Sequence, residues 1–250
     1  MARIAISRGH GGRNTFDVGA KDLLTEVIEN RRVGQRVTAI LNEANIETLY
    51  FEETAATKVN DNLANLVTWH NRQVRDIDIQ MHFNKVGSTT DRAIGVEVWH
   101  YGASTRANAA RISKAISNAS GLKDRGAKQS AELYFLRKTE KPAYLIEVCF
   151  VESRPDVALY QQHFESICQA IAKEATAIIG TQLVLPVKIK EELNDMKQLL
   201  GKTQQDDMRN LLQRAYKQGT FTKNHSLNVT KMTRGEALDL LISYNARMLK

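Results

Sequence analysis

The sequence is poor in cysteine and has no long apolar run. Two of its 250 residues are cysteines, Cys149 and Cys168, and both lie in apolar stretches. This usage indicates buried free thiols and excludes a framework of disulfides. No stretch reaches the length of about 20 apolar residues that a membrane-spanning helix requires. The first ten residues lack the apolar core of a secretory signal, so we expect neither a signal peptide nor a membrane span.

Charge is unevenly distributed along the chain, whose formal net charge is +7. Residues 181–250 hold 12 Lys and Arg against 7 Asp and Glu, whereas residues 1–180 hold 23 against 21. A basic segment attracts nucleic acid, an anionic membrane surface or an anionic polymer such as those of a bacterial wall. Few aromatic residues alternate with the basic ones and acids are mixed among them, which disfavours a nucleic-acid platform. We expect no nucleic-acid or membrane partner.

Strand-like and helix-like patterns alternate along residues 1–180. This alternation is typical of an α/β sheet with helices on both faces. In such folds, functional residues gather beyond the carboxyl ends of the strands. The predicted strands are 3–7, 46–52, 76–84, 93–102 and 143–151, and the predicted helices are 23–45, 62–74, 104–121 (with Ser104 as its N-cap and Gly121 at its end) and 155–180.

The pattern changes after Gly180. Residues 181–202 predict a linker containing Pro186, followed by a short helix. Its apolar stripe is too brief to establish a coiled coil, which leaves both a monomer and a dimer open. Residues 203–250 predict two helices. We therefore expect an α/β domain, a linker and a small all-α C-terminal module.

Four acids and imidazoles occupy positions that suit a metal site at the strand ends. His10 stands among three glycines directly after the first predicted strand, and His82 lies near the end of the third. Glu26 lies near the start of the first predicted helix, and Glu147 lies inside the last, apolar strand. Two histidines and a carboxylate are a common ligand set for catalytic zinc, with a fourth position left for water. A further carboxylate can then transfer the proton.

Each of these residues also has a structural explanation. His10 can be part of a glycine turn, and His82 can be a half-buried strand histidine. Glu26 can complement a helix dipole, and Glu147 can pair with a buried arginine such as Arg125. A phosphate-binding loop is excluded, because "RGHGGR" lacks the spacing of both common glycine motifs. The histidines at 70, 100, 163 and 225 have no second ligand at metal spacing.

Four segments occur in a particular order along residues 1–180: "RIAISRGHGGR", "IQMHFN", "GLKDRGAK" and "KPAYLIEVCFVESRPD". In this order they resemble the opening strand and turn, the S-x-H-x-N motif, the D-R-G-x-K segment and the P-a-x-L-x-E-x-G-F segment of one family. That family is the zinc-dependent N-acetylmuramoyl-L-alanine amidases of type 3. The resemblance covers nearly the whole predicted α/β part.

The resemblance implies a twisted, mostly parallel sheet of about six strands with flanking helices. It implies Zn²⁺ bound by His10, Glu26 and His82, with Glu147 as the catalytic acid and base. The implied activity is hydrolysis of the amide between the lactyl group of N-acetylmuramic acid and L-alanine in bacterial peptidoglycan. Three further residues fall in motif positions near the expected substrate groove: Asn84, Arg125 and Lys128.

Two positions depart from the family pattern. The family's metal-binding glutamate follows a short loop containing glycine, whereas here Glu29 competes with Glu26 in "DLLTEVIEN". Glu26 lies 15 residues before Leu41, which matches the family's spacing. Cys149 stands where the family commonly has glycine, a change that we expect to alter packing behind the site.

An amidase domain followed by a small basic module, without a signal peptide, is similar to a phage or prophage endolysin. Such an enzyme collects in the host cytoplasm and reaches the cell wall once the membrane is opened. The basic module would then bind anionic wall polymers, or else serve dimerisation or stability. The alternative function is a non-catalytic wall-binding or regulatory protein on an amidase-like fold. The intact set of four residues favours the enzyme.

Overall fold

The computed structural model describes residues 3–184, 206 and 210. The chain divides into two units, residues 1–184 and 185–250. All the helices and strands given below belong to the first unit. The predicted linker and C-terminal module lie almost entirely outside the described residues, so their boundaries stay predictions.

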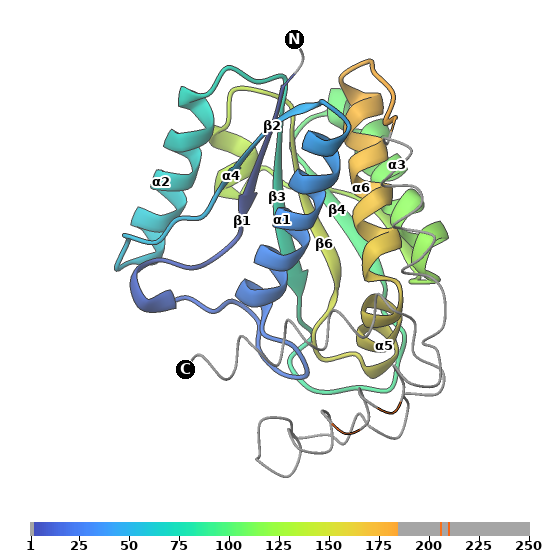
Figure 1. The fold of residues 1–250 in the computed structure, drawn as a ribbon. Helices are drawn as coiled ribbons and strands as arrows, with labels where there is room; N and C mark the ends of the chain where they lie inside the picture. Colours follow the sequence, from blue (N-terminus) through green and yellow to red (C-terminus); the bar gives the residue numbers. More distant parts are fainter. Residues whose placement is uncertain (1–2, 185–205, 207–209, 211–250) are drawn as a thin grey trace. The chain divides into compact units, whose positions relative to one another are not determined.

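A six-stranded sheet runs through the first unit (Figure 1). Its strand order is β2-β1-β3-β6-β4-β5. Strand β4 pairs antiparallel with β6, and the other neighbouring strands are parallel. This arrangement confirms the mostly parallel sheet that the sequence predicts. The strands are β1 (Arg3–Arg8), β2 (Glu47–Phe51), β3 (Ile77–Asn84), β4 (Val96–His100), β5 (Asp124–Gln129) and β6 (Ala143–Phe150).

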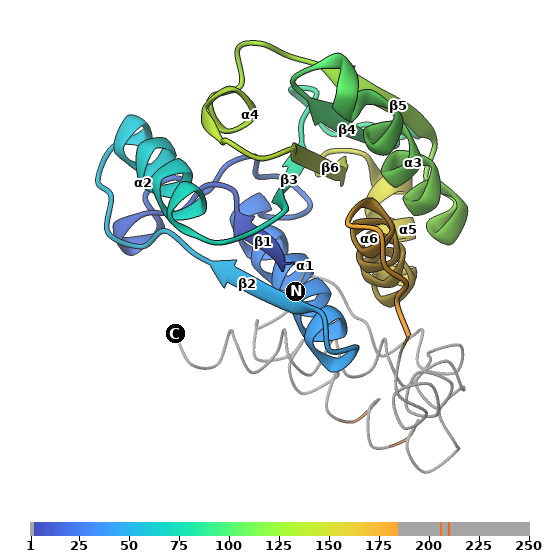
Figure 2. The same ribbon diagram turned by 90° about the horizontal axis from the view of Figure 1, so that it is seen from above.

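Helices cover both faces of the sheet, as predicted. Figure 2 shows α1, α3 and α6 on one face and α2 with α4 on the other. None of the helices in the described part of the chain is both long and apolar enough to cross a membrane. The helices are α1 (Glu26–Glu43), α2 (Val59–Arg72), α3 (Ala103–Ser120), α4 (Tyr134–Lys138), α5 (Arg154–Gln162) and α6 (Phe164–Ile178), with one 3-10 turn, η1 (Arg13–Thr15).

The long helix predicted over 155–180 is in fact two helices. His163 separates α5 from α6 with φ −116° and ψ 21°, which is outside the helical region. Apolar side chains continue at helical spacing across this junction, because Tyr160, Phe164 and Ile167 are all buried. Periodicity therefore could not reveal the break.

The structure also corrects the start of one predicted helix and adds one strand and one helix that the sequence did not predict. Ser104 is not the N-cap of α3, because the helix begins at Ala103 with Gly102 as its cap. Gly121 does end this helix, with a left-handed φ of 79° that glycine adopts readily. Strand β5 and the short helix α4 escaped prediction, since β5 is a polar edge strand and α4 is shorter than two turns.

Alternation along β3 divides its side chains between the two faces of the sheet. Phe83 contacts Tyr160 of α5 edge to face, with the ring centroids 4.9 Å apart. Asp78 instead accepts a hydrogen bond from His70 of α2. Successive strand residues point to opposite faces, so Gln80 and His82 share the face of Asp78. The predicted site residues of β3 thus lie on the face covered by α2 and α4.

The core is apolar on both sides of the sheet. Val33, Val37, Ile40 and Leu41 of α1 have no exposed surface, which confirms the predicted amphipathic helix. Both cysteines are buried thiols that are not joined in a disulfide, as their apolar surroundings predict. Cys149 lies in β6, two residues beyond Glu147. The change in packing that we expect from a cysteine at this position stays a prediction.

Candidate metal centre and active site

Glycines allow three side chains to approach closely at the carboxyl end of β1 and β3. A Cβ atom at Gly9 would lie 2.3 Å from the ring of His82, and one at Gly19 would lie 2.3 Å from Glu26 Oε2. Gly19 also has a φ of 67°, a conformation that residues with a side chain rarely adopt. The glycines flanking the turn after β1 thus make room for His82 and Glu26 beside His10.

The imidazole of His10 is oriented by Asp17. Its Nδ1 lies 2.9 Å from Asp17 Oδ2, while its Nε2 lies 3.2 Å from Glu26 Oε1. An ionised carboxylate can only accept a hydrogen bond, so Nδ1 carries the hydrogen in this contact. In the protonated ring, Nε2–H donates to Glu26, and a metal ion that displaces this proton would bind the Nε2 lone pair.

The imidazole of His82 is oriented in the same way by Gln80. Its Nε2 lies 3.1 Å from Gln80 Oε1, and its Nδ1 lies 2.9 Å from Glu26 Oε1. In the metal-free fold, a ring N–H that faces the ionised Glu26 donates to it. A metal ion that replaces this proton on Nδ1 would bind the Nδ1 lone pair, with the ring hydrogen on Nε2 donated to Gln80 Oε1.

Glu26 is held in place by the backbone around it. Its Oε2 accepts a hydrogen bond from the Ala20 N–H at 2.6 Å, and its Oε1 accepts one from the Phe83 N–H at 3.1 Å. The carboxylate side chain is only 4% exposed. It is therefore fixed in position before any ligand binds.

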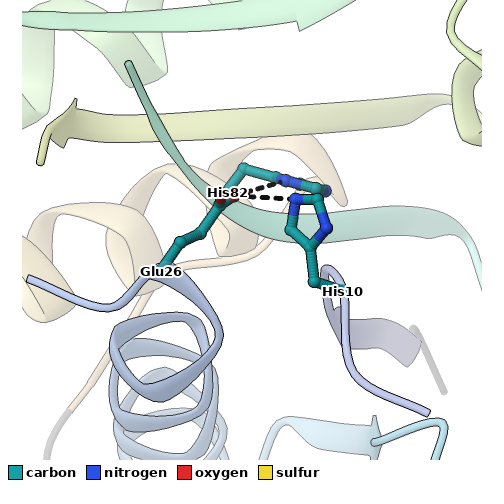
Figure 3. Close-up of side chains that lie close together, drawn as sticks. All are labelled: His10, Glu26 and His82. Atoms are coloured by element: carbon teal, nitrogen blue, oxygen red, sulfur yellow. Dashed lines mark hydrogen bonds and ion pairs between the residues drawn. The ribbon is translucent and has the colours of Figure 1, made fainter. Parts of the chain in front are cut away.

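His10, Glu26 and His82 converge on one point (Figure 3). One donor atom from each lies within 4.8 Å of the others. Among the residues that the structure describes, these three form the group of His, Cys, Asp or Glu side chains that could hold a metal ion. Two nitrogen donors and one oxygen donor suit zinc, and fixing the distal nitrogens of both histidines is typical of zinc ligands. The residues present fit that metal.

The charges within this cluster are strongly coupled. Burial lowers the pKa of His10, but hydrogen bonds and negative charge from Glu26 and Asp17 outweigh burial and raise it to about 9. Burial raises the pKa of Glu26, yet its contacts with His10 and His82 bring it well below the usual range. Burial dominates at His82 and lowers its pKa. Glu26 is therefore ionised, and His10 is the group in which a proton competes with a metal ion.

Glu147 lies beside this cluster on the next strand. It is paired with His82 in the register of β6 with β3, and its Oε2 is a buried oxygen without a hydrogen-bond partner. Burial, followed by the charges of Glu26 and Glu97, raises the pKa of Glu147 well above its ordinary value. A buried carboxyl group near the metal ligands that binds a proton more tightly than usual can take up and return a proton, which suits it to acid–base chemistry.

Glu97 forms a hub next to Glu147 that sequence reasoning missed. Its carboxylate accepts hydrogen bonds from Asn84 Nδ2 at 2.9 Å, Trp99 Nε1 at 3.2 Å and Arg125 Nε at 2.7 Å. Arg125 therefore pairs with Glu97, so the structural alternative of an Arg125–Glu147 pair is wrong. Glu97 lies in an apolar strand, the same signal that singled out Glu147, and that signal could have found it.

The three candidate groove residues lie near Glu147 in different ways. Asn84 lines the same open groove as Glu147. Arg125 is a partly exposed member of the Glu97 hub, and its guanidinium also lies over the ring of Phe150 at 5.1 Å. Lys128 is paired with Trp99 in the register of β5 with β4. Their roles toward a substrate stay predictions.

Glu29, the competing metal ligand, has other partners. Its Oε2 accepts a hydrogen bond from the Tyr160 hydroxyl at 2.6 Å and lies 2.7 Å from Arg32 Nη1. This places its carboxylate between α1 and α5 rather than in the cluster. The geometry thus favours Glu26, as the spacing does.

The remaining described histidines belong to the packing of the fold. His70 is fully buried, with Nδ1 2.7 Å from Asp78 Oδ1. His100 is also buried and bonds to the backbone of Gly102. His163 separates α5 from α6, and His225 lies outside the described residues. Sequence reasoning also missed Asp17 and Gln80, since short polar residues near a ligand leave no pattern of their own.

Comparison with known proteins gives consistent matches. Residues 4–178 match the profile of the N-acetylmuramoyl-L-alanine amidase family. Two uncharacterized proteins of Clostridium perfringens are each 34% identical to the chain. The matches extend over 167 and 186 residues, which are 66% and 70% of this chain. They cover 49% and 53% of those relatives, so the chain spans about half the length of the curated relatives it matches.

Several solved structures share the fold. The amidase AmiC2 of Nostoc punctiforme is 25% identical with a TM-score of 0.61, covering 72% of this chain and 97% of that one. The catalytic domain of the amidase CwlV of Bacillus (Paenibacillus) polymyxa is 23% identical with a TM-score of 0.63, covering 73% and 100%. The catalytic domain of the CD27L endolysin, which targets Clostridia Difficile, is 20% identical with a TM-score of 0.64, covering 74% and 100%. On the family profile, which spans more than half of its residues, this chain belongs to the N-acetylmuramoyl-L-alanine amidase family.

Proposed function

We propose that this chain hydrolyses the amide bond between the lactyl group of N-acetylmuramic acid and L-alanine in peptidoglycan. Membership of the amidase family supports the reaction. The observation that carries the proposal is the convergence of His10, Glu26 and His82 beside a Glu147 oxygen that has no partner. A ligand set with an adjacent proton-transfer group is what metal-assisted amide hydrolysis needs.

His10, Glu26 and His82 would hold a zinc ion. When bound, zinc supplies Lewis acidity that polarises the scissile carbonyl and makes water a better nucleophile at neutral pH. Asp17 and Gln80 keep the two imidazoles in the tautomers that bind metal, and the backbone keeps Glu26 in place.

Glu147 would move the proton. As the attacking water forms its bond to the carbonyl carbon, the Glu147 carboxylate takes the water proton. It then gives this proton to the alanine nitrogen as the C–N bond breaks, so that the amine leaves neutral. The products are a free lactyl carboxyl on the glycan and a peptide with a free L-alanine amino terminus.

Digestion of purified peptidoglycan tests this function directly. The full chain is incubated with peptidoglycan after treatment with a chelator and again after zinc is restored, and the new chain ends are assigned by mass spectrometry. We expect free L-alanine amino termini in the zinc-restored sample alone. Well-folded, zinc-loaded protein that releases no such ends would contradict the proposal and favour the non-catalytic wall-binding protein. Release of reducing sugar ends instead would indicate a glycosidase.

We also propose that the enzyme is a phage or prophage endolysin for host lysis. The basic segment 181–250 supports this role, as does the similarity in fold to the CD27L endolysin catalytic domain. The protein would collect in the bacterial cytoplasm and act on the wall once the membrane is opened. Expression in a bacterial host should therefore lower culture turbidity only after a membrane-permeabilising agent is added. Lysis without that agent would contradict this localisation.

A further inference from the structure

An open groove of about 580 Å³ is lined by Glu147, Asn84 and Trp99. The segment that joins β5 to α4 also lines it, with Ser130, Glu132 and Leu133 among its residues. The proposed proton-transfer group and an aromatic ring therefore share one groove.

The indole of Trp99 is fixed within this groove. Its Nε1 donates a hydrogen bond to Glu97 Oε1 at 3.2 Å. The ring packs on a buried apolar cluster that includes Leu145 of β6 and Phe135 of α4. The rest of its surface lines the groove. An aromatic ring held on one side by packing and at one edge by a hydrogen bond is a rigid platform for a ligand.

The segment that joins β5 to α4 is also held in place before a ligand arrives. Ser130 Oγ accepts hydrogen bonds from the N–H groups of Glu132 and Leu133 at 3.1 and 3.2 Å. The Ser130 N–H donates to the His100 carbonyl of β4 at 3.0 Å. These bonds connect the segment to the strand that carries Trp99, so the width of the groove is fixed by the fold.

The described side chains that line the groove offer a carboxylate no basic partner. Of the described residues that line it, Glu132 and Glu147 are acidic and none is Lys or Arg. The nearby guanidinium of Arg125 is bonded to Glu97. A peptide carrying carboxylates would meet like charge here, whereas an N-acetylated pyranose is neutral, has an apolar C–H face for an aromatic ring and offers hydroxyl and amide groups to polar walls.

We propose that this groove binds the N-acetylmuramoyl sugar of the substrate, with Trp99 as the platform under its ring and the peptide stem directed to the other side of Glu147. This inference rests on the proposed function, since it assigns one half of that substrate to a place. Trp99 thereby becomes a specificity residue for glycan-linked peptides.

Tryptophan fluorescence tests the sugar site without any turnover. The chain has two tryptophans, and Trp69 is stacked on Phe51 at 4.8 Å, away from the groove lining. In a Trp69→Phe variant of the full chain, Trp99 is the sole indole. Titration with the peptide-free disaccharide of N-acetylglucosamine and N-acetylmuramic acid, with the lactyl carboxyl capped as a methylamide so that the ligand is neutral, should shift the emission of Trp99 and protect it from acrylamide. The peptide L-Ala–D-isoGln–L-Lys should do neither.

The matched control is Trp99→Phe, in which Trp69 alone is observed and the disaccharide should cause no change. A response of Trp99 to the peptide and none to the disaccharide would assign the groove to the peptide stem. No response to either ligand at saturating concentration would also overturn the proposal. A response to the disaccharide in a protein that cuts no peptidoglycan would leave the sugar site standing and refute the amidase.

Kinetics provide a second, independent readout. Removing the aromatic platform in Trp99→Leu should raise KM for a disaccharide-linked peptide about tenfold, the effect of losing one aromatic contact, and change kcat little. A sugar-free N-lactoyl peptide is the reference substrate, and the ratio of kcat/KM for the disaccharide-linked peptide to kcat/KM for this reference should fall about tenfold in Trp99→Leu. Trp99→Phe should retain most of the affinity because it retains a ring. An equal loss on both substrates would assign Trp99 a structural role only.

Discussion

Glu97 lies directly opposite Glu147 in the antiparallel pairing of β4 with β6. Three donors satisfy the Glu97 carboxylate, whereas Glu147 Oε2 has no partner. Burial and the neighbouring charges of Glu26 and Glu97 raise the pKa of Glu147. This difference in surroundings supports the proposed acid–base role of Glu147 and a supporting role for Glu97.

Glu147→Gln should retain zinc and lose turnover. The amide cannot accept the proton from water, and a positioned acid–base group contributes about 10²- to 10⁴-fold to the rate. Zinc content of the purified variant and release of L-alanine termini from peptidoglycan provide the two measurements. Glu140→Gln, an exposed position outside the site, is the matched control and should behave like the unaltered chain. Near-native activity of Glu147→Gln would refute this mechanism.

Substitution of the two glutamates in the first turn of α1, Glu26 and Glu29, should distinguish metal binding from packing. Glu26→Gln should lose stoichiometric zinc, as should His10→Ala and His82→Ala, because each removes one of three ligands. Glu29→Gln should keep zinc and lower only the melting temperature, since its carboxylate bonds to Tyr160 and Arg32. Zinc analysis and thermal melting of the metal-free variants decide between them. Zinc loss in Glu29→Gln with zinc retained in Glu26→Gln would reverse the assignment.

The sequence carried the main features of the fold and the candidate ligands for clear physical reasons. Period-2 and period-3.6 patterns located most elements because their apolar faces are buried, as at Val33 and Val37 of α1. Glu147 was conspicuous because a carboxylate is costly within an apolar strand. Glycines around His10 indicated a turn, and the structure shows that they also admit the side chains of the neighbouring ligands.

Other features leave no periodic signal. Strand β5 is a polar edge strand that owes its place to pairing with β4, which no local pattern reveals. The break at His163 interrupts the backbone but not the spacing of apolar residues. Asp17 and Gln80 each contact one ligand histidine through a single hydrogen bond, and a single polar residue has no periodic pattern that would single it out in the sequence. Such partners emerge from three-dimensional contacts alone.

The basic C-terminal segment should affect wall binding more than catalysis. All the elements that form the candidate site belong to residues 3–184, and removal of 181–250 takes away an excess of five positive charges from the chain. We expect the shortened protein to sediment less with intact cell walls, most clearly at low salt, yet to cut a soluble muropeptide at a similar rate. An equal loss of wall binding and of muropeptide cleavage would show that the segment has a structural role.

Gln80 should tune metal affinity through His82. Gln80→Leu removes the acceptor for His82 Nε2, so the ring loses its fixed orientation and tautomer. Loss of such a partner typically weakens metal binding about 10- to 100-fold. Gln80→Glu keeps an acceptor oxygen and should keep most of the affinity. Competition for zinc with a coloured chelator measures both variants. If Gln80→Leu and Gln80→Glu bound zinc with equal affinity, the contact between Gln80 and His82 would have no effect on metal binding.

Zinc affinity should rise with pH between about 6.5 and 9. The contacts of His10 raise its pKa to about 9 in the metal-free fold, so the ring is protonated at neutral pH, and zinc must displace that proton. Each pH unit in this window should therefore strengthen binding about tenfold through this one proton.

The same shift has the opposite effect on the stability of the metal-free protein. A raised pKa means that the folded state binds the proton more tightly than the unfolded chain does. This contribution to stability is fully present below about pH 6.5 and is lost as pH rises through about 9. Chelator competition and denaturant unfolding, each measured from pH 6 to 10, should give opposite slopes. Zinc affinity that is constant between pH 7 and 9 would show that His10 is already neutral there. The variant Asp17→Asn removes one of the two negative charges that raise the pKa of His10. It should therefore move both transitions, in zinc affinity and in stability, to lower pH.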